Sequence, residues 1–489
     1  MQPTTFSPGF GPSVRPAPAR KPVTAAQLAP PPSSYLTLCI VILVAELLNL
    51  QTRIFEFYLN GLRIPLVISV MLAAVLLFSL TTQSANLTKR TTGLIVLLFG
   101  WLSVSTLFST WRSNSVTELS GYVFLAMVGV AIASMIDTPA RFIRMLTIVG
   151  FLYGGTMTMG FLLAEPDAPR LQLLRGSYSD PNLYGLTVST GIPIMWWLMK
   201  SGNLLLRLAA FAVSIGMYWV VLKTGSRGAL IALIVMMVLA VFYAPPMRKV
   251  MIVVALALGV LGASLVLSTY AKKRLFTLFD SAKVSDEELQ SMSGSERNSL
   301  SGDVGSSESR WQLLLDSLEI TAKHPVLGVG PGNFGDARWG MHLARVGRNI
   351  AAQTTHNTYT QLSSEAGLLS LAIFLVQIFD AFRNLKFIRK WNSRDGYAPS
   401  PQLQQAAHYL RFVLFAQCVG MFFLSLAYNS PFCIIAGLTL ALRNTVEKEW
   451  MRYRVALAAP ETPQDPDMQN PRYGNPGYQN SGGRAFRTA

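Results

Sequence analysis

The sequence predicts an all-α fold: a polytopic membrane bundle of about twelve helical spans, with a large external loop that bears a short helical cap. The first observation is the composition, because 51% of the 489 residues are hydrophobic and only 13% are charged. Soluble domains carry about a quarter charged residues. The second is a series of apolar stretches, each close to membrane length. The third is a single long hydrophilic segment, between Tyr270 and Thr355.

Each apolar stretch is a candidate span because a transmembrane helix needs about 20 predominantly apolar residues. The candidates lie near 35–50, 62–80, 92–110, 119–136, 142–164, 183–199, 204–222, 228–244, 249–268, 357–382, 408–427 and 431–442. The last stretch is short and begins at Pro431, so it has the weakest signal of the twelve.

The distribution of basic residues orients the bundle, because positive charge concentrates in the cytoplasmic loops of membrane proteins. If the N-terminus is cytoplasmic, Lys89-Arg90, Arg141, Arg248-Lys249 and the basic stretch from Arg443 to Arg454 all fall inside. The short outside loops carry fewer basic residues. Both termini are therefore expected in the cytoplasm, and the net charge of +16 reflects topology rather than nucleic-acid binding.

Five consecutive regions follow from this topology. Residues 1–33 form a Pro/Ala-rich cytoplasmic tail, 34–269 hold spans one to nine, 270–356 form the large external loop, 357–445 hold spans ten to twelve, and 446–489 form a second cytoplasmic tail. Neither tail has enough apolar surface to bury on folding, so both are expected to be disordered.

The external loop predicts a small helical cap. Its first part is Ser/Gly-rich and is expected to be mobile. A helix is then predicted from Ser309, the capping residue, with Gln312 at the capping-box position. His324-Pro325 ends this helix, because the residue before proline disfavours the α region. Three glycines follow and permit sharp turns and close backbone approach, namely Gly328, Gly330 and Gly332.

Polar residues gather where this loop meets the membrane. His356 and Asn357 stand at the amino end of a predicted span, where free N–H groups and the helix dipole favour an anion. The topology puts further charged residues at the same level, namely Arg175, Asp180, Arg227 and Arg310. A crevice with several arginines and one histidine suits a lipid substrate that carries phosphate.

Three stretches carry a resemblance to a known family. They are "GSRGAL" at 225–230, "HPVLGVGPGNF" at 324–334 and "THNTYTQLSSEAGLL" at 355–369. In this order, with the large loop before the histidine, they resemble the motifs of the O-antigen ligase/polymerase family. That family includes O-antigen ligases, Wzy-type repeat-unit polymerases and some protein O-oligosaccharyltransferases. The resemblance covers the core from about residue 35 to 445.

The resemblance implies an activity and a location. The activity is transfer of an undecaprenyl-diphosphate-linked glycan on the periplasmic face of the bacterial inner membrane. The fold implied is GT-C-like, and the family's functional residues map onto Arg227, Arg310 and His356. It further implies a metal-independent glycosyltransferase with no cofactor. The sequence agrees in offering no pair of acidic residues in an external motif. Its three cysteines lie in apolar runs without zinc-site spacing.

The residue types fit this chemistry on their own terms. Arginines bind diphosphate oxygens bidentately and stay charged in a partly dry site. A histidine titrates near neutral pH and can remove the proton of an acceptor hydroxyl, so His356 is the candidate base. Glu365 lies about two and a half helical turns further on. It is expected to pair with an arginine of another helix or to face the crevice.

Structural alternatives exist for each of these residues. His356 fits an ordinary interfacial polar group, and Arg227 an anchor that extends to the lipid headgroups. Arg310 fits a surface charge at a helix start. The sequence Asp180-Pro181-Asn182 fits a turn that begins the sixth span.

At the level of function, the acceptor is left open between another lipid-linked repeat (a polymerase) and a lipid A-core sugar (a ligase). The alternative class is a transporter or exporter of a solute or lipid-linked glycan. Such proteins often show paired half-repeats with broken helices. No matching half-repeats are evident in this sequence.

Overall fold

The computed structural model describes residues 89–165, 168–173, 177–266, 294–347, 353–391, 396–429 and 431–458. Within these ranges the protein consists of helices and connecting loops, with a single isolated bridge between Ala164 and Leu173. The spans predicted at 35–50 and 62–80 lie outside the described residues, as do the first tail and Arg175.

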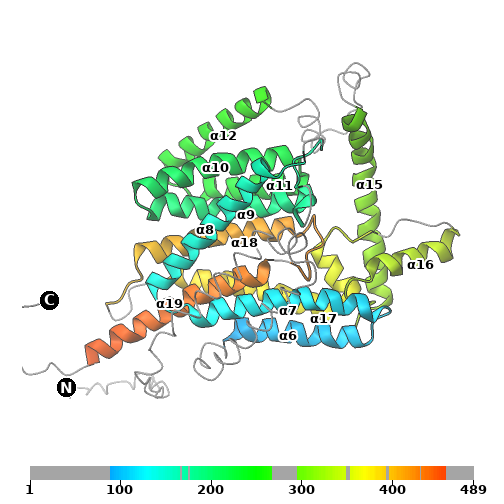
Figure 1. Ribbon diagram of the computed structural model, residues 1–489. Coiled ribbons are helices and arrows are strands. Elements are labelled where there is room, and N and C mark those ends of the chain that lie inside the picture. The colour runs from blue at the N-terminus through cyan, green and yellow to red at the C-terminus, as the bar shows by residue number, and fades with distance from the viewer. Residues whose placement is uncertain are drawn as a thin grey trace, which may run out of the picture.

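The helices follow the predicted spans closely (Figure 1). They are α6 (Arg90–Leu107), α7 (Arg112–Met135), α8 (Pro139–Leu162), α9 (Pro181–Ser201), α10 (Leu204–Thr224), α11 (Arg227–Tyr243), α12 (Pro246–Val266), α15 (Gly294–Lys323), α16 (Phe334–Val346), α17 (Thr358–Arg389), α18 (Pro401–Gly420) and α19 (Phe432–Ala458). A short 3-10 helix, η1, covers Ser177–Ser179.

Among the described residues, five helices are long and apolar enough to cross a membrane, namely α6, α7, α8, α10 and α17. Helix α11 is apolar but shorter. The prediction of an all-α, multi-pass membrane protein is therefore confirmed. The count of twelve spans and the GT-C likeness stay predictions.

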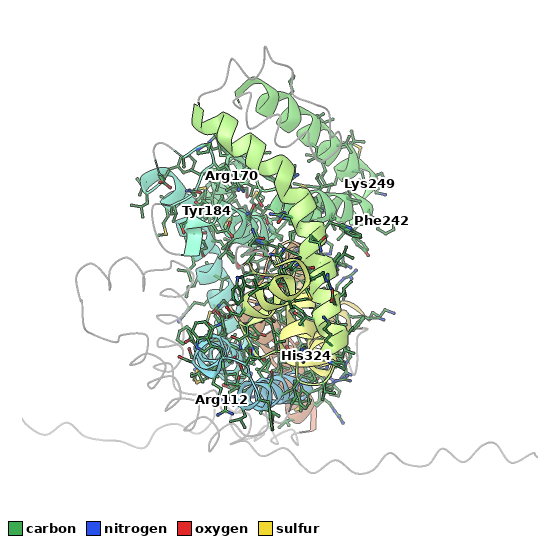
Figure 2. All side chains as sticks on the ribbon, turned by 90° about the vertical axis from the view of Figure 1, so that its right-hand side faces the viewer. Arg112, Arg170, Tyr184, Phe242, Lys249 and His324 are labelled. Atoms are coloured by element: carbon green, nitrogen blue, oxygen red, sulfur yellow. The ribbon has the colours of Figure 1, made fainter. Side chains whose placement is uncertain are left out.

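Most of the helices run along one common direction, and α15 lies across one end of the bundle (Figure 1). This end, with α15 and α16, is the cap end; the opposite end is the far end. Figure 2 looks onto the cap end and shows α15 passing in front of the bundle. Helix α17 contacts α6, α15, α18 and α19, so it links the cap to the bundle core.

Capping residues explain where several helices begin. The Asp180 carboxylate accepts a hydrogen bond of 2.8 Å from the Asn182 N–H at the start of α9, and Pro181 follows at the first helical position. A proline costs nothing there, because its missing N–H has no intrahelical partner. Ser226 caps α11 in the same way through the Ala229 N–H. The predicted turn before the sixth span is therefore confirmed.

The cap helix is longer than predicted. Helix α15 begins at Gly294, so Ser309 lies inside it and not at its start. The Ser309 hydroxyl donates to the Gln353 side chain at 3.4 Å, and Gln312 donates to Asp316 at 2.9 Å. No proline interrupts 294–323, so a helix that has formed in its apolar half propagates toward the amino end. Its predicted end is confirmed, because α15 stops one residue before His324.

A second cap helix, α16, packs on α15 and was not predicted. The buried Asp316 carboxylate accepts from Arg338 at 2.7 Å and pairs with the His342 ring at 3.0 Å. Burial would raise the pKa of Asp316, but the hydrogen bonds from Arg338, Gln312 and His342 lower it below its usual value. The carboxylate therefore stays charged and holds the two cap helices together.

The end of the chain differs from the prediction in two places. The span predicted at 408–427 is α18, which ends at Gly420, and residues 421–429 form a loop. Hydropathy misses this break because the loop is itself apolar and includes Leu424, which is buried. The last predicted span continues as α19 to Ala458. The predicted tail of 446–489 is therefore helical in its first part.

Candidate active site

His356 has an unusual backbone conformation at the cap end of the bundle. Its φ is 50°, the single positive value for a non-glycine residue in the described part of the chain. Such a conformation costs on the order of 1–3 kcal/mol and persists where the surroundings impose it. The surroundings here are the neighbouring Thr355, whose hydroxyl lies 3.0 Å from the Ser425 hydroxyl, and Thr358, whose N–H donates to the Met421 carbonyl at 2.8 Å.

Asn357 acts as the cap of α17, directly after His356. Its side-chain oxygen accepts from the Tyr359 and Thr360 N–H groups at 2.9 and 3.2 Å. The expected helix start at His356-Asn357 is thus confirmed. Because Asn357 occupies two of the free N–H groups, fewer of them remain for an external anion than the sequence suggested.

The 421–429 loop fixes the first turn of α17, a role that sequence reasoning missed. The Thr358 hydroxyl donates to the Leu424 carbonyl at 2.7 Å and accepts from the Leu426 N–H at 3.0 Å. The Gln361 side chain accepts from the Ala427 N–H at 3.1 Å. These polar side chains of "THNTYTQ" satisfy the backbone of a buried loop. These polar residues are the one sequence signal for the role of the 421–429 loop.

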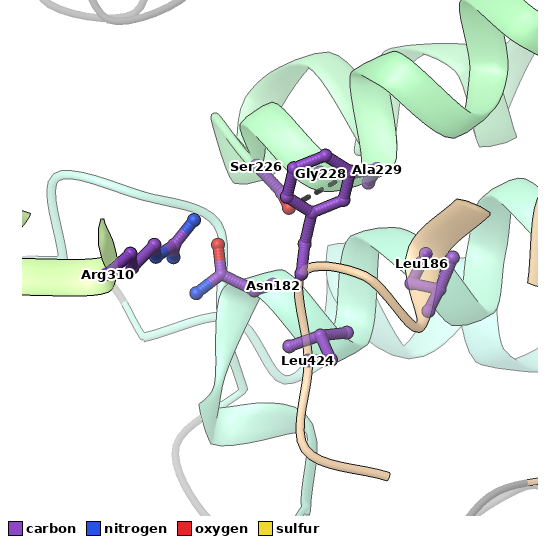
Figure 3. Close-up of a pocket in the computed structure, with 9 residues that line it drawn as sticks. Asn182, Leu186, Ser226, Gly228, Ala229, Arg310 and Leu424 are labelled. Carbon is purple, nitrogen blue, oxygen red and sulfur yellow. Dashed lines mark hydrogen bonds between the residues drawn. The ribbon is translucent and has the colours of Figure 1, made fainter. Parts of the chain in front are cut away.

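Arg310 extends from α15 over a small hollow between α9 and α11. The hollow is lined by Asn182, Leu186, Ser226, Gly228, Ala229, Arg310, Gly420, Phe423 and Leu424. In Figure 3 the guanidinium of Arg310 points toward the Asn182 amide. Among the described residues Arg310 makes no hydrogen bond and no ion pair with a carboxylate. Its donors are therefore available to a ligand.

Arg310 interacts electrostatically with three of the other predicted site residues. Burial lowers the pKa of Arg310, the charge of Arg227 lowers it further, and Asp180 opposes both effects. Burial also lowers the pKa of His356, with a further lowering from Arg310 and an opposing effect from Asp180. The structure thus places His356, Arg310, Arg227 and Asp180 within one local field. The lowered pKa of His356 favours its neutral form, which can accept a proton.

Arg170 is a structural arginine that sequence reasoning did not single out. Its Nε–H donates to the Thr224 carbonyl at 2.8 Å, and its Nη2 donates to the Asn182 side-chain oxygen at 2.8 Å. It therefore ties the end of α10 to the start of α9, directly beside the Arg310 hollow. Nothing in the sequence separates it from the neighbouring arginine at 175, which was predicted to bind diphosphate.

Glu365 does not pair with an arginine, contrary to one of its two expected environments. Its carboxylate accepts from the Gly332 N–H at 2.9 Å and the Phe334 N–H at 3.3 Å. Gln361 donates to it at 3.4 Å. It also lines a hollow of about 210 Å³ together with Glu118, Gly332, Gly335, Asp336, Gln353, Thr354 and Gln361. Glu365 therefore holds the Gly-rich turn at 324–334 in place.

The Gly-rich turn docks into a break in α17. Gly367 leaves the helix with φ 81° and ψ 170°. The carbonyls of Ser364 and Glu365 accept from the Val329 and Gly330 N–H groups at 3.0 and 2.8 Å. The Trp101 indole N–H donates to the Ala366 carbonyl at 2.8 Å. A broken helix at membrane depth is possible where the freed backbone groups find protein partners, as they do here.

The predicted turn geometry of the three earlier glycines is confirmed. Gly328, Gly330 and Gly332 all have positive φ, at 65°, 101° and 77°. A side chain on Gly328 would collide with the Glu365 backbone, and one on Gly330 would collide with the Ser109 side chain. The close approach between the turn and α17 therefore requires glycine at these positions.

Together, the helices and the site define a class of protein: a multi-pass membrane protein with a histidine and two arginines at one end of an all-helical bundle. Residues 194–375 match the family model described as O-Antigen ligase, and this match supports a place in the O-antigen ligase family. The matched segment contains Arg227, Arg310 and His356. Similarity to this family suggests a glycosyltransferase-like enzyme. No match to a curated protein was found.

Proposed function

We propose that the protein transfers a glycan from an undecaprenyl-diphosphate carrier to an acceptor sugar hydroxyl, on the periplasmic face of the bacterial inner membrane. In this proposal both termini are cytoplasmic and the cap end is periplasmic. The observation that carries the proposal is the shared field of His356 and Arg310, close to Arg227, inside the segment that matches the family. The comparisons give no support to the transporter alternative.

The proposed chemistry is a displacement at the anomeric carbon of the donor. His356 takes the proton of the acceptor hydroxyl, and the acceptor oxygen forms the new bond to the anomeric carbon. The bond from that carbon to the diphosphate oxygen breaks, and its electron pair leaves on the diphosphate. Arg310 and Arg227 stabilise this developing charge with charge-assisted hydrogen bonds. In this scheme the arginines supply the charge neutralisation, and we propose that no metal is needed.

The positions of the neighbouring groups fit these roles. The loop at 421–429 hydrogen-bonds Thr355 and Thr358, on either side of His356, and so supports the backbone that carries the imidazole. Arg310 comes from the cap and Arg227 from the bundle, so a diphosphate between them would bridge the two. Asp180 caps α9 with one carboxylate oxygen and balances part of the positive charge.

A direct test uses the purified full-length protein in lipid, with an undecaprenyl-diphosphate-linked glycan and two separate acceptors. Formation of a longer lipid-linked glycan identifies a polymerase, and formation of a glycosylated lipid A-core identifies a ligase. Activity that survives a chelator supports the metal-independent scheme. If neither acceptor is glycosylated while the donor is bound, the proposed transfer is wrong.

Replacing Arg310 or Arg227 with glutamine is expected to weaken transfer by about 10- to 100-fold, because each change removes a charged hydrogen-bond donor to the diphosphate. Steady-state kinetics with varied donor concentration would measure this loss. The matched control is Arg345→Gln, since Arg345 is exposed on the cap and pairs with Glu319 at 2.6 Å. An equal loss in the control would show that the cap fold, and not diphosphate binding, is what the arginines serve.

The acid limb of the pH profile is expected to shift in opposite directions in two variants. His356 acts as a base when neutral, so kcat/KM falls as the pH drops through its lowered pKa. Arg310→Gln removes a positive charge, raises this pKa and moves the acid limb to higher pH. Asp180→Asn keeps a capping side chain but removes a negative charge, so it lowers the pKa and moves the limb to lower pH.

The measurement is kcat/KM from about pH 5 to 8 for both variants and the unmodified protein. Opposite shifts identify His356 as the titrating group. An acid limb that stays in place in both variants would mean that another group controls it.

A further inference from the structure

The far end of the bundle holds a cluster of cations around one aromatic ring, here called the Tyr243 cluster (Tyr243, Arg248, Arg389, His408 and Arg411). The Arg411 guanidinium carbon lies 3.9 Å from the centroid of the Tyr243 ring, and that of Arg389 lies 5.8 Å from the same centroid. The Arg411 Nη2 and the His408 Nδ1 are 3.5 Å apart. Arg248, near the start of α12, interacts with the neighbouring Tyr409.

Within the described residues, the cations of this cluster have no carboxylate partner. Arg411 is the most informative of them, because its side chain comes from the interior of α18 and is 7% exposed. Its Nε atom is buried and has no hydrogen-bond partner. A buried charge with an unsatisfied donor is costly unless an anion completes its environment. The cation–π contact with Tyr243 supplies only part of that compensation.

Other basic residues at the far end are paired with carboxylates. Lys89 and Arg443 both pair with Glu447, at 2.6 and 2.8 Å. Lys448 pairs with the buried Asp137 at 3.0 Å. The bundle therefore places carboxylates opposite its inward-facing cations elsewhere at the far end. Among the described residues the Tyr243 cluster has no such carboxylate, which favours an anionic ligand.

The surface beside the cluster indicates what carries that anion. Residues of α11 and α12 next to it present large apolar side chains outward, including Phe242, which is 71% exposed, and Met247, which is 79% exposed. Figure 2 shows Phe242 and Lys249 together at one edge of the bundle. An edge with apolar side chains and adjacent cations matches a phospholipid, whose acyl chains and phosphate lie side by side at a membrane surface.

We propose that the Tyr243 cluster binds the phosphate of an anionic phospholipid, with the acyl chains against α11 and α12. Arg389 and Arg411 would donate to the phosphate oxygens through charge-assisted hydrogen bonds. The site joins α11, α12, α17 and α18 far from His356. Lipid binding is therefore expected to stabilise the bundle without contributing a group to glycan transfer.

The test measures lipid binding by the full-length protein, purified in a neutral detergent. Thermal stability is followed while phosphatidylglycerol, phosphatidylcholine or inorganic phosphate is added, because a ligand of the folded state raises Tm with its concentration. Native mass spectrometry counts the lipids that remain bound. The expected result is a rise in Tm with phosphatidylglycerol, and no comparable rise with the other two.

Two variants and a control locate the site. Arg411→Gln is the direct variant, but its side chain is buried and the change can impair folding. Arg389→Gln changes an exposed residue and keeps the test valid; it is expected to weaken the apparent affinity for phosphatidylglycerol by about tenfold. The control is Arg207→Gln, an exposed arginine that donates to the Gly202 carbonyl at 2.7 Å at the same end.

Three outcomes overturn the proposal. An equal effect of phosphatidylglycerol on the Arg389 and Arg207 variants would show that the lipid binds elsewhere. A rise in Tm with inorganic phosphate alone, of the same size, would identify a site for free phosphate. Equal binding of phosphatidylcholine would show that the lipid's charge is not recognised.

Discussion

Replacing His356 with asparagine is expected to abolish glycan transfer while the protein remains folded in the membrane. The loss should be at least 10²–10⁴-fold, the usual contribution of a general base. Asparagine is the preferred replacement, because it is one of the few residues that readily adopt the left-handed conformation found at position 356. The substitution therefore removes the imidazole and keeps the backbone that loop 421–429 imposes. His356→Ala adds strain and serves as the harsher variant.

This prediction can be measured in a bacterial strain that lacks the native gene. Surface polysaccharide is separated on gels, and the amount of protein in the membrane is measured in parallel. Single repeats on the core would indicate a lost polymerase, and accumulated lipid-linked polymer would indicate a lost ligase. The matched control is His324→Gln, because His324 is exposed at the end of α15. Unchanged glycan in the His356 variants would mean that this residue only precedes the start of α17 and has no role in catalysis.

Gly367→Ala is expected to destabilise the protein by about 3 kcal/mol or more, because alanine is poorly compatible with φ 81° and ψ 170°. The added methyl group would also collide with the Val326 carbonyl. Either α17 straightens or the Gly-rich turn leaves its break, and both would displace the cap. Loss of transfer is expected to accompany the loss of stability.

The measurement is thermal unfolding in detergent, with hydrogen exchange of residues 324–334 as the local readout. Gly340→Ala is the control, because a methyl group there meets no atom within 4 Å and alanine favours the helix α16. An unchanged melting temperature for Gly367→Ala would mean that the break in α17 is not required for the fold.

Much of the bundle could be predicted from the sequence because its signals are local. Apolar length located the helices, and Asp180 and Asn357 behave as the capping residues their positions suggest. The three glycines at 328, 330 and 332 predicted a tight turn, which the structure confirms. His356, Arg310 and Arg227 come from three separate motifs. Their order along the chain led to the family, but only the fold brings them into one field.

The remaining features depend on contacts that no local pattern encodes. The partners of Glu365 are backbone N–H groups of a turn some thirty residues earlier, and nothing near Glu365 in sequence names them. The break in α17 is hidden because a single glycine, Gly367, at the start of a long apolar run is compatible with a continuous helix. The loop at 421–429 is hidden because most of its residues are apolar and several are buried, as in the spans around it. In both cases the hydropathy of the segment indicates that it can be buried, but it does not indicate whether its backbone is helical.

Helix α15 is attached to α17 near its carboxyl end, so a tilt about this attachment would move the rest of the helix. Near its carboxyl end the Thr321 hydroxyl lies 2.9 Å from that of Ser363 on α17, and from there the helix crosses the cap end to Arg310. The 11 residues from Arg310 to this pivot at Thr321 span about 17 Å at a rise of about 1.5 Å per residue. A tilt of about 10° at the pivot therefore moves Arg310 by about 3 Å. A displacement of that size makes or breaks a charge-assisted hydrogen bond, so a small motion at the pivot would make or break the contact that we propose between Arg310 and the diphosphate.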